Sequence, residues 1–479
     1  MKQVIVLINI AFSISLFAAD FSMNGINEIE YIYKTAKDSL NHFFEDEFSF
    51  RMNYDNFTFG MKFIAELPAY NDFEKIEHLN NDDISYQWDE RFLSYRNKNL
   101  YILGGNFEEN FGTGIVLRAY EDEDFDIDTR LEGGIVKYNS NLFDITALYG
   151  TLNNENRPQK NDLAYGFDLE SSLFNNSLQI SGSAASYRHI HDVGNRYSDL
   201  QVLGGRVSYF YNWFDIYVEA ASLEEEKTEI EKKTGTAYYG NINTYLDKYS
   251  FSAGYKNYKD FDFRMNDLPT LNHSGEPLSE NLDSGYDEIG FMGEFRYNPN
   301  YFNELILNYS EGWNKDKTIQ ISDFYTEFHH DFGNWSLTAS YEQIEKMEEP
   351  ISLWSKEITP ALASDLILNE KPVYLKFEYK FYDKKHANDK KKYYEPLLQA
   401  DFEIGKIGIS LISQFHYDNI SQIAENEVWL GAEIASDIGE DTRIKLFGGK
   451  EKGGKICRNG ICRYQSAFEG IRLELITNF

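Results

Sequence analysis

Apolar and polar residues alternate with a period of two along most of the chain. In the C-terminal segment, Ile471, Leu473 and Leu475 share one face, while Arg472 and Glu474 take the other. The same alternation recurs at 57–65, 143–149 and 335–341. Successive side chains of a β-strand point to opposite faces, so the pattern predicts strands with one apolar and one polar face. Soluble sandwiches and membrane barrels both produce this pattern, and the connections separate them.

The connections between these strands alternate between short and long. Tight turns are expected at 139–141, 174–175, 212, 247, 298–300, 333, 369–371, 405–406 and 439. Long polar connections are expected at 122–130, 152–162, 188–199, 223–234, 258–287, 345–357, 382–395, 418–426 and 451–467. Short turns at one end and long loops at the other are typical of a transmembrane barrel. The sequence therefore predicts an all-β fold: a single transmembrane, antiparallel, up-and-down β-barrel of about 24 strands, within a range of roughly 22–26.

Three segments are less regular. Residues 100–120 contain two strand-like halves where an up-and-down barrel has room for one, so we expect one distorted strand with a bulge or an inward excursion. Residues 26–44 fit both a strand and a helix, and we expect a first strand near 25–33 and a helical turn at 36–44. The longest connection, 258–287, is the best candidate for a loop folded into the lumen.

Residues 1–19 have the pattern of a secretory signal peptide. Lys2 precedes a mostly apolar stretch that ends at Phe17, and Ala18 and Ala19 follow. This stretch is shorter than the roughly 20 residues that a membrane-spanning helix needs. We expect cleavage after Ala18 or Ala19, export from the cytoplasm, and a barrel that covers residues 20–479.

Composition narrows the class of protein further. Aromatic residues make up 16% of the chain, as expected for the interfacial girdles of a barrel. The mean hydropathy of −0.52 and the lack of a later apolar run of spanning length argue against membrane helices. The formal net charge of −32 argues against a nucleic-acid partner and favours cations around the loops and lumen.

Three stretches together carry a family resemblance. They are Gly105–Phe107 with Phe111–Asp122, the segment 453–463 with its two cysteines, and the terminal Phe479. They resemble an uncharacterised family, a domain of unknown function, of porin-like outer-membrane β-barrel proteins from Bacteroidetes-type bacteria. The resemblance implies the barrel fold and a location in the outer membrane, and it implies no activity.

The C-terminal strand resembles the signal that the outer-membrane assembly machinery recognises. Ile471, Leu473 and Leu475 form its apolar face, and Phe479 is the aromatic carboxyl-terminal residue on which it ends. The sequence therefore predicts that this machinery and outer-membrane lipid are partners of the chain.

Cys457 and Cys462 flank a hairpin signal. Asn459-Gly460 favours a two-residue type I′ turn, which places Arg458 opposite Ile461 and Cys457 opposite Cys462. Residues facing each other at a non-hydrogen-bonded site lie roughly 4.5 Å apart at Cα, within the range of a disulfide. We expect a disulfide, with free thiols or a metal site as the alternatives.

Two clusters of like charge stand out. Asp122, Asp124, Asp126 and Asp128 would point the same way in an extended chain, which makes them weak candidates for a divalent-cation site. A solvated loop is the favoured interpretation. The second cluster consists of lysines in the 382–395 connection: Lys384, Lys385, Lys390, Lys391 and Lys392. A solvated loop is favoured here too, with contact to lipid phosphates as the alternative.

These features favour a porin-like channel or transporter whose solute the sequence does not identify. The alternative is a non-conducting scaffold, an adhesin, or a translocon plugged by a partner such as a lipoprotein. No arrangement of nucleophile, base and metal ligands points to an enzyme, and no cofactor is implied.

Overall fold

The computed structural model describes most of the chain as β-strands. The described residues are 21–35, 41–68, 84–122, 127–153, 161–190, 197–226, 232–275, 278, 287–349, 352–386, 389–418, 426–458, 461–465 and 467–479. Their strands form one antiparallel sheet of 24 strands and three separate two-stranded sheets. No helix in these ranges is long and apolar enough to cross a membrane.

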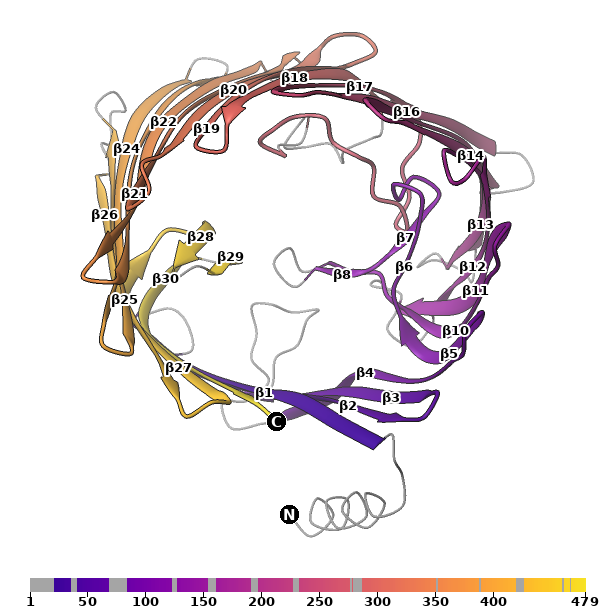
Figure 1. Cartoon of the computed structure of the whole chain (residues 1–479), viewed down its shortest axis with the longest axis horizontal. Coiled ribbons are helices and arrows are strands. Elements are labelled where there is room, and N and C mark those ends of the chain that lie inside the picture. The colour runs from indigo at the N-terminus through magenta and orange to yellow at the C-terminus, as the bar shows by residue number, and fades with distance from the viewer. Residues whose placement is uncertain are drawn as a thin grey trace.

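The wall of the barrel follows the order of the sequence (Figure 1). Its strands are β1 (Phe21–Lys34), β2 (His42–Tyr54), β3 (Phe57–Leu67), β4 (Ser85–Arg96), β5 (Leu100–Phe107), β10 (Leu131–Asn139), β11 (Phe143–Asn153), β12 (Asn161–Leu173), β13 (Leu178–Ile190), β14 (Tyr197–Tyr211), β15 (Phe214–Glu226), β16 (Lys232–Leu246), β17 (Tyr249–Lys259), β18 (Glu288–Asn300), β19 (Asn303–Asn314), β20 (Ile319–Asp331), β21 (Trp335–Glu348), β22 (Leu353–Leu368), β23 (Lys371–His386), β24 (Asp389–Ile404), β25 (Ile407–Asp418), β26 (Glu427–Ile438), β27 (Thr442–Glu451) and β30 (Phe468–Asn478). The remaining short strands are β6 (Glu109–Phe111), β7 (Leu117–Ala119), β8 (Glu121–Asp122), β9 (Ile127–Asp128), β28 (Gly454–Arg458) and β29 (Ile461–Gln465).

The first and last wall strands close the barrel. β1 pairs with β30 from Ile26 opposite Asn478 to Lys34 opposite Gly470. Closure leaves the wall without an unpaired edge, which is the condition for spanning a membrane with strands. The predicted fold class, an all-β antiparallel up-and-down barrel of about 24 strands, is confirmed.

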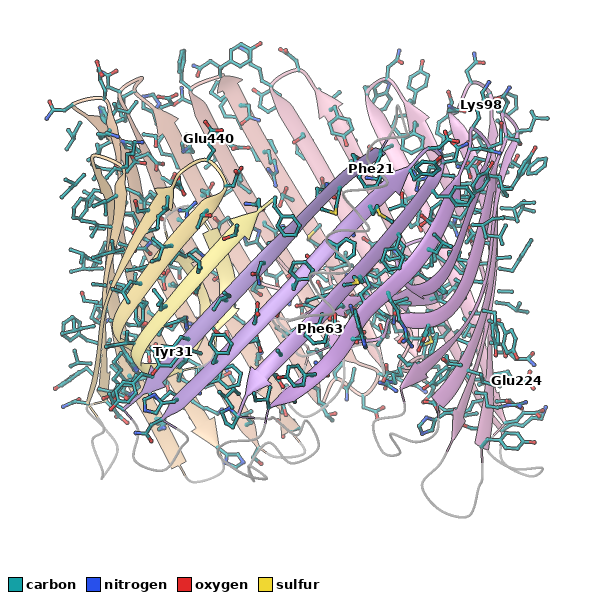
Figure 2. All side chains as sticks on the ribbon, turned by 90° about the horizontal axis from the view of Figure 1, so that it is seen from below. Phe21, Tyr31, Phe63, Lys98, Glu224 and Glu440 are labelled. Carbon is teal, nitrogen blue, oxygen red and sulfur yellow. The ribbon has the colours of Figure 1, made fainter. Side chains whose placement is uncertain are left out.

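The wall has an apolar outer face and a largely polar inner face. On β14, Leu203 and Val207 point outward with 62% and 42% of their surfaces exposed. Arg206 lies between them in sequence and points inward, where it contacts Asp168 of β12 at 2.8 Å. Figure 2 shows Phe21 at the rim that carries the short turns. The outer face is the one expected to contact lipid.

The expectation of a helical turn at 36–44 is wrong for the part of this segment that the structure describes. β1 continues to Lys34 and β2 begins at His42, and residues 36–40 lie outside the described residues. His42 faces Tyr33 across the two strands, and its Nδ1 lies 2.6 Å from the hydroxyl of Tyr31. The apolar residues that fit one helical stripe are divided between two paired strands.

Two long connections and one turn were misplaced by the sequence pattern. The 382–395 connection is mostly strand, because β23 runs to His386 and β24 starts at Asp389. The connection expected at 345–357 narrows to 349–352, and the turn expected at 298–300 lies at 301–302. Strand ends that extend past a membrane have water on both faces, so their residues lose the apolar alternation that identifies a strand.

Candidate functional site: the barrel lumen

The irregular segment after β5 turns into the lumen. The inward excursion, one of two expectations for residues 100–120, is what the structure contains: β5 ends at Phe107 and the wall resumes at Leu131. The described residues between them carry the hairpins β6–β7 and β8–β9, which lie inside the ring (Figure 1). We call 108–130 the luminal insert. Gly112 and Gly114 allow its first turn, with φ of +64° and +99°.

The luminal insert docks on the inner wall through apolar side chains. Phe111, Ile115 and Val116 are almost completely buried. The wall strands beneath them provide glycines: a Cβ at Gly204 would lie 2.4 Å from Val116, and a Cβ at Gly166 would lie 2.9 Å from Phe111. Real Cβ atoms do not approach so closely, so a side chain at either wall position would force its neighbours to shift, and glycine lets the insert seat closely on the wall.

A second segment packs on the insert from the other side. Phe261, Met265 and Leu268, in the long connection after β17, are buried in the same apolar cluster. The backbone N–H of Arg118 donates to the carbonyl of Met265 at 2.8 Å, and the Arg118 side chain forms an ion pair with Asp267. Residues 260–275 of this connection thus lie inside the ring, and Arg118 and Asp267 join them to the insert (Figure 1).

A buried carboxylate ties the insert to the wall. Glu219 of β15 is only 1% exposed. Its Oε2 accepts hydrogen bonds from the backbone N–H and the hydroxyl of Thr113, at 3.1 and 2.8 Å, and from the hydroxyl of Tyr217 at 2.5 Å. A buried carboxylate without donors is costly, so these bonds favour the docked insert.

Arg130 forms ion pairs with acidic residues of both the insert and the wall. Its guanidinium lies 3.1 Å from Asp89 on β4, 2.6 Å from Glu121 and 2.9 Å from Asp128. Burial raises the pKa of Glu121 to about 7, although the positive charge of Arg130 opposes the rise. Glu121 therefore changes its charge near neutral pH, at the margin of the lumen.

Two of the four residues proposed as a weak cation site lie in the described part of the chain. Asp122 belongs to β8 and Asp128 to β9, and the Asp128 carboxylate binds the guanidinium of Arg130. Asp124 and Asp126 lie outside the described residues. Within the described ranges, no group of three or more histidine, cysteine or acidic side chains is arranged to hold a metal ion.

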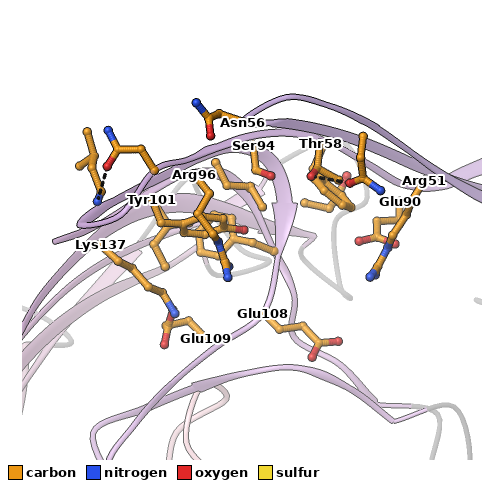
Figure 3. A pocket seen from close by; sticks show the side chains of 18 of the residues that line it. Arg51, Asn56, Thr58, Glu90, Ser94, Arg96, Tyr101, Glu108, Glu109 and Lys137 are labelled. Carbon is orange, nitrogen blue, oxygen red and sulfur yellow. Dashed lines mark hydrogen bonds and ion pairs between the residues drawn. The ribbon is translucent and has the colours of Figure 1, made fainter. Parts of the chain in front are cut away.

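A polar cavity of about 1050 Å³ lies between the insert and the wall near the short-turn end (Figure 3). Its lining includes Arg51, Asn53, Thr58, Glu90, Ser94, Arg96, Tyr101, Asn106, Glu108, Glu109, Glu121, Arg130 and Lys137. Lys137 of β10 reaches Glu109 of the insert at 2.5 Å. The cavity thus offers charges and amide groups to a solute, beside a smaller apolar share that includes Phe92, Leu103 and Ile135.

Carboxylates lie opposite each other on the inner face of the first strands. Glu30 of β1 faces Glu45 of β2, which in turn faces Glu66 of β3. Arg472 of β30 reaches Glu30 at 3.2 Å. Three carboxyl groups thus lie beside one guanidinium on this part of the inner wall, so acidic groups outnumber basic ones among these four residues.

The cysteine hairpin has the register that the sequence predicts. β28 and β29 pair with Arg458 opposite Ile461 and Cys457 opposite Cys462. Asn459 and Gly460 lie outside the described residues, and the disulfide itself stays a prediction. Mass spectrometry of the unreduced, alkylated protein is expected to find the two cysteines linked within one chain. Two alkylated cysteines in protein from native membranes would contradict the linkage.

The C-terminal signal residues lie on the outer face of the last strand. Ile471 and Leu473 are 48% and 37% exposed, and Leu475 faces Ile29 of β1. Phe479 exchanges two backbone hydrogen bonds with Gly25, at 2.9 and 3.0 Å. Its ring stacks on Phe48 at 5.7 Å. The predicted signal is thus part of the seam that closes the barrel.

Comparisons with known proteins support the fold and leave the solute open. Residues 33–277 match DUF6029, described as a family of unknown function, and no curated protein matches the chain in sequence. A structure of an E. coli P pilus tip assembly intermediate, PapC-PapD-PapK-PapG, is similar with a TM-score of 0.60 at 8% identity, over 95% of this chain and 60% of that chain. At this identity the likeness shows a common fold.

Two Pseudomonas aeruginosa proteins are also similar. The siderophore receptor PirA has a TM-score of 0.49 at 9% identity, over 96% of this chain and 81% of that chain. The outer membrane protein OpdK has a TM-score of 0.43 at 10% identity, over 73% of this chain and 98% of that chain.

Proposed function

The chain belongs to DUF6029, a family of unknown function, and from this premise we propose that it is an outer-membrane channel for small polar solutes that prefers cations. One observation carries the proposal: a polar cavity of about 1050 Å³ remains beside the luminal insert, inside a closed wall with an apolar exterior. Barrels wider than roughly 16–18 strands leave an aqueous channel unless something fills them.

Location in the outer membrane is part of this proposal. The pattern of residues 1–19 supports export through a signal peptide, and the alternation ending at Phe479 supports insertion by the outer-membrane assembly machinery. Both ends of the barrel chain lie at the short-turn rim, and in bacterial barrels this rim faces the periplasm.

The inward segments set the size and charge of the proposed path. The luminal insert and 260–275 occupy the lumen beside β10–β20, where the ring of His273 stacks on that of Tyr325 in β20. The polar cavity lies along β1–β5 and β10, so solutes would pass there. On that side the path meets the acids Glu45 and Glu66 and the mixed charges around Arg130. A path with this lining favours small hydrated cations and polar molecules over apolar ones.

Planar-bilayer recordings of the purified full-length protein test the proposal. We expect steady conductance, and a reversal potential in a salt gradient that shows preference for cations, because the mature inner wall is rich in carboxylates. Correctly folded protein that passes no current would favour the non-conducting scaffold or the partner-plugged translocon. Preference for anions would contradict the assigned selectivity and leave the channel itself standing.

A further inference from the structure

Lysines gather on the outer face of the wall at the long-loop end of β22–β24. Their strands lie across the ring from the wall that holds the insert (Figure 1). Lys385 of β23 faces Lys390 of β24, and Trp354 of β22 faces Lys385 from the other side. One row nearer the membrane, Lys356, Asp383 and Lys392 face one another. We call Lys356, Lys385, Lys390 and Lys392 the lysine patch.

The lysine patch has few anions of its own. Lys392 binds Asp383 at 2.9 Å, and Lys385 lies 4.4 Å from the ring centre of Trp354. Glu345 of β21 lies opposite Lys356, and its Oε1 accepts the indole N–H of Trp354 at 2.8 Å. The four lysines of the patch therefore lie beside two acids, Asp383 and Glu345. Lysines directly opposite each other in a ladder are destabilising unless an anion lies between them.

Two other outward lysines at the same end of the barrel are neutralised within the protein. Lys232 lies 2.7 Å from Glu224 and 2.6 Å from Glu226. Lys450 lies 2.5 Å from Glu427. The chain has 78 acidic and 46 basic residues, so a surface with an excess of lysine differs from the net negative charge of the chain as a whole. The excess at β22–β24 therefore indicates an anion supplied from outside the chain.

An aromatic row fixes the height of the lysine patch. Directly below it, Phe381, Tyr379 and Tyr417 surround Tyr394, with ring centres 5.4, 6.0 and 6.5 Å from that of Tyr394. Outward aromatic rows of barrels lie at the membrane–water interface. The lysines lie two and four residues beyond the aromatic row, towards the long-loop end of the strands. Because the strands are tilted, this spacing places them about 5–10 Å further from the membrane centre than the aromatic rings. This is the level of lipid headgroups.

We propose that the lysine patch, with Trp354 beside it, binds the phosphate groups of a phosphorylated lipid of the outer leaflet. The inference rests on the proposed membrane position. Ammonium groups bind phosphate as point charges, and paired lysines on one face match a headgroup with more than one phosphate. The neighbouring aromatic row packs against the upper part of the acyl chains, which a free phosphate ion does not have.

Native mass spectrometry of the full-length protein in a neutral detergent tests the proposal. The probe is diphosphorylated lipid A, and its dephosphorylated form serves as the neutral comparison. The variant is the double change Lys385→Gln and Lys390→Gln. The control is Lys232→Gln with Lys450→Gln, which removes the same charge from paired sites at the same end of the barrel. We expect about tenfold weaker lipid binding for the variant and unchanged binding for the control.

The other outcomes decide against the patch or against its ligand. Equal binding by the variant and the control would overturn the site. Equal binding of the dephosphorylated lipid would overturn phosphate recognition. Full displacement of the lipid by 10 mM inorganic phosphate would mean that the patch binds free phosphate with an affinity on the order of millimolar, and would assign it to free anions instead. Lipid binding is measured in detergent without any current, so a failed conductance test and a failed lipid test are distinguishable.

Discussion

Deleting Phe479 is expected to abolish assembly of the barrel while export continues. Phe479 exchanges two backbone hydrogen bonds with Gly25, and its ring stacks on Phe48 across the seam between β30 and the first strands. Each backbone bond is worth about 1 kcal/mol in water and more where lipid offers no substitute. Heat-modifiability on a gel and membrane fractionation measure the loss. A folded, membrane-inserted truncation would refute the assignment.

Two further variants separate closure of the seam from recognition by the assembly machinery. Phe302→Ala removes an exposed aromatic ring from a turn at the same rim and is expected to assemble normally. Gly25→Leu keeps Phe479 but places a side chain where a Cβ would lie 2.5 Å from its ring and 2.6 Å from the carbonyl of Ser49. If Gly25→Leu fails to assemble, packing at the seam is required. If it assembles normally while the truncation fails, the terminal residue acts through recognition.

The outer face of the barrel was predictable because lipid imposes one simple rule on it. Every second residue must be apolar wherever a strand crosses the bilayer, as at Phe143, Ile145 and Tyr149. Turn residues then mark where each crossing ends. These local rules were sufficient for the strand number, for most tight turns and for the register of the cysteine hairpin.

The inner face was less predictable because it obeys no single rule. Val202 and Ala237 point into the lumen and are completely buried, although the pattern alone assigns a polar face to those positions. They are apolar because they belong to the buried cluster that the wall forms with the two inward segments, and that cluster joins residues far apart in the sequence. The run Ile115-Val116-Leu117, apolar on consecutive residues, was the available signal that this segment is buried on both sides.

The strand ends were missed for a different reason. Lys384 to Lys392 contain no alternating apolar residue, so the sequence suggests a solvated loop. The structure pairs Lys384 with Lys391 and Lys385 with Lys390 in a regular ladder. Above the membrane both faces of a strand meet polar surroundings, and only backbone hydrogen bonds to the neighbouring strands keep it extended. These bonds form with almost any side chains, so the sequence does not reveal them.

The largest functional effect is expected from releasing the luminal insert. Val116 is completely buried, and its Cγ2 lies where a Cβ of Gly204 would be 2.4 Å away. Val116→Asp places a charge in this contact, and an unpaired buried carboxylate costs several kcal/mol. The wall keeps its own ladder of hydrogen bonds, so the barrel should fold while the insert detaches. We expect single-channel conductance to rise severalfold in planar bilayers.

Ile127→Asp is the matched control for this variant. It makes a similar change of a branched apolar residue to aspartate in the same insert, but Ile127 is 36% exposed, so the insert should stay docked and the conductance should change little. Limited proteolysis within 108–130 reports release independently of the current, because a detached insert is open to cleavage. Release of the insert in Val116→Asp without a rise in conductance over Ile127→Asp would show that the insert does not restrict the path. The flow would then be limited elsewhere, and the segment 260–275, joined to the insert through Arg118 and Asp267, would be the next part of the lumen to remove.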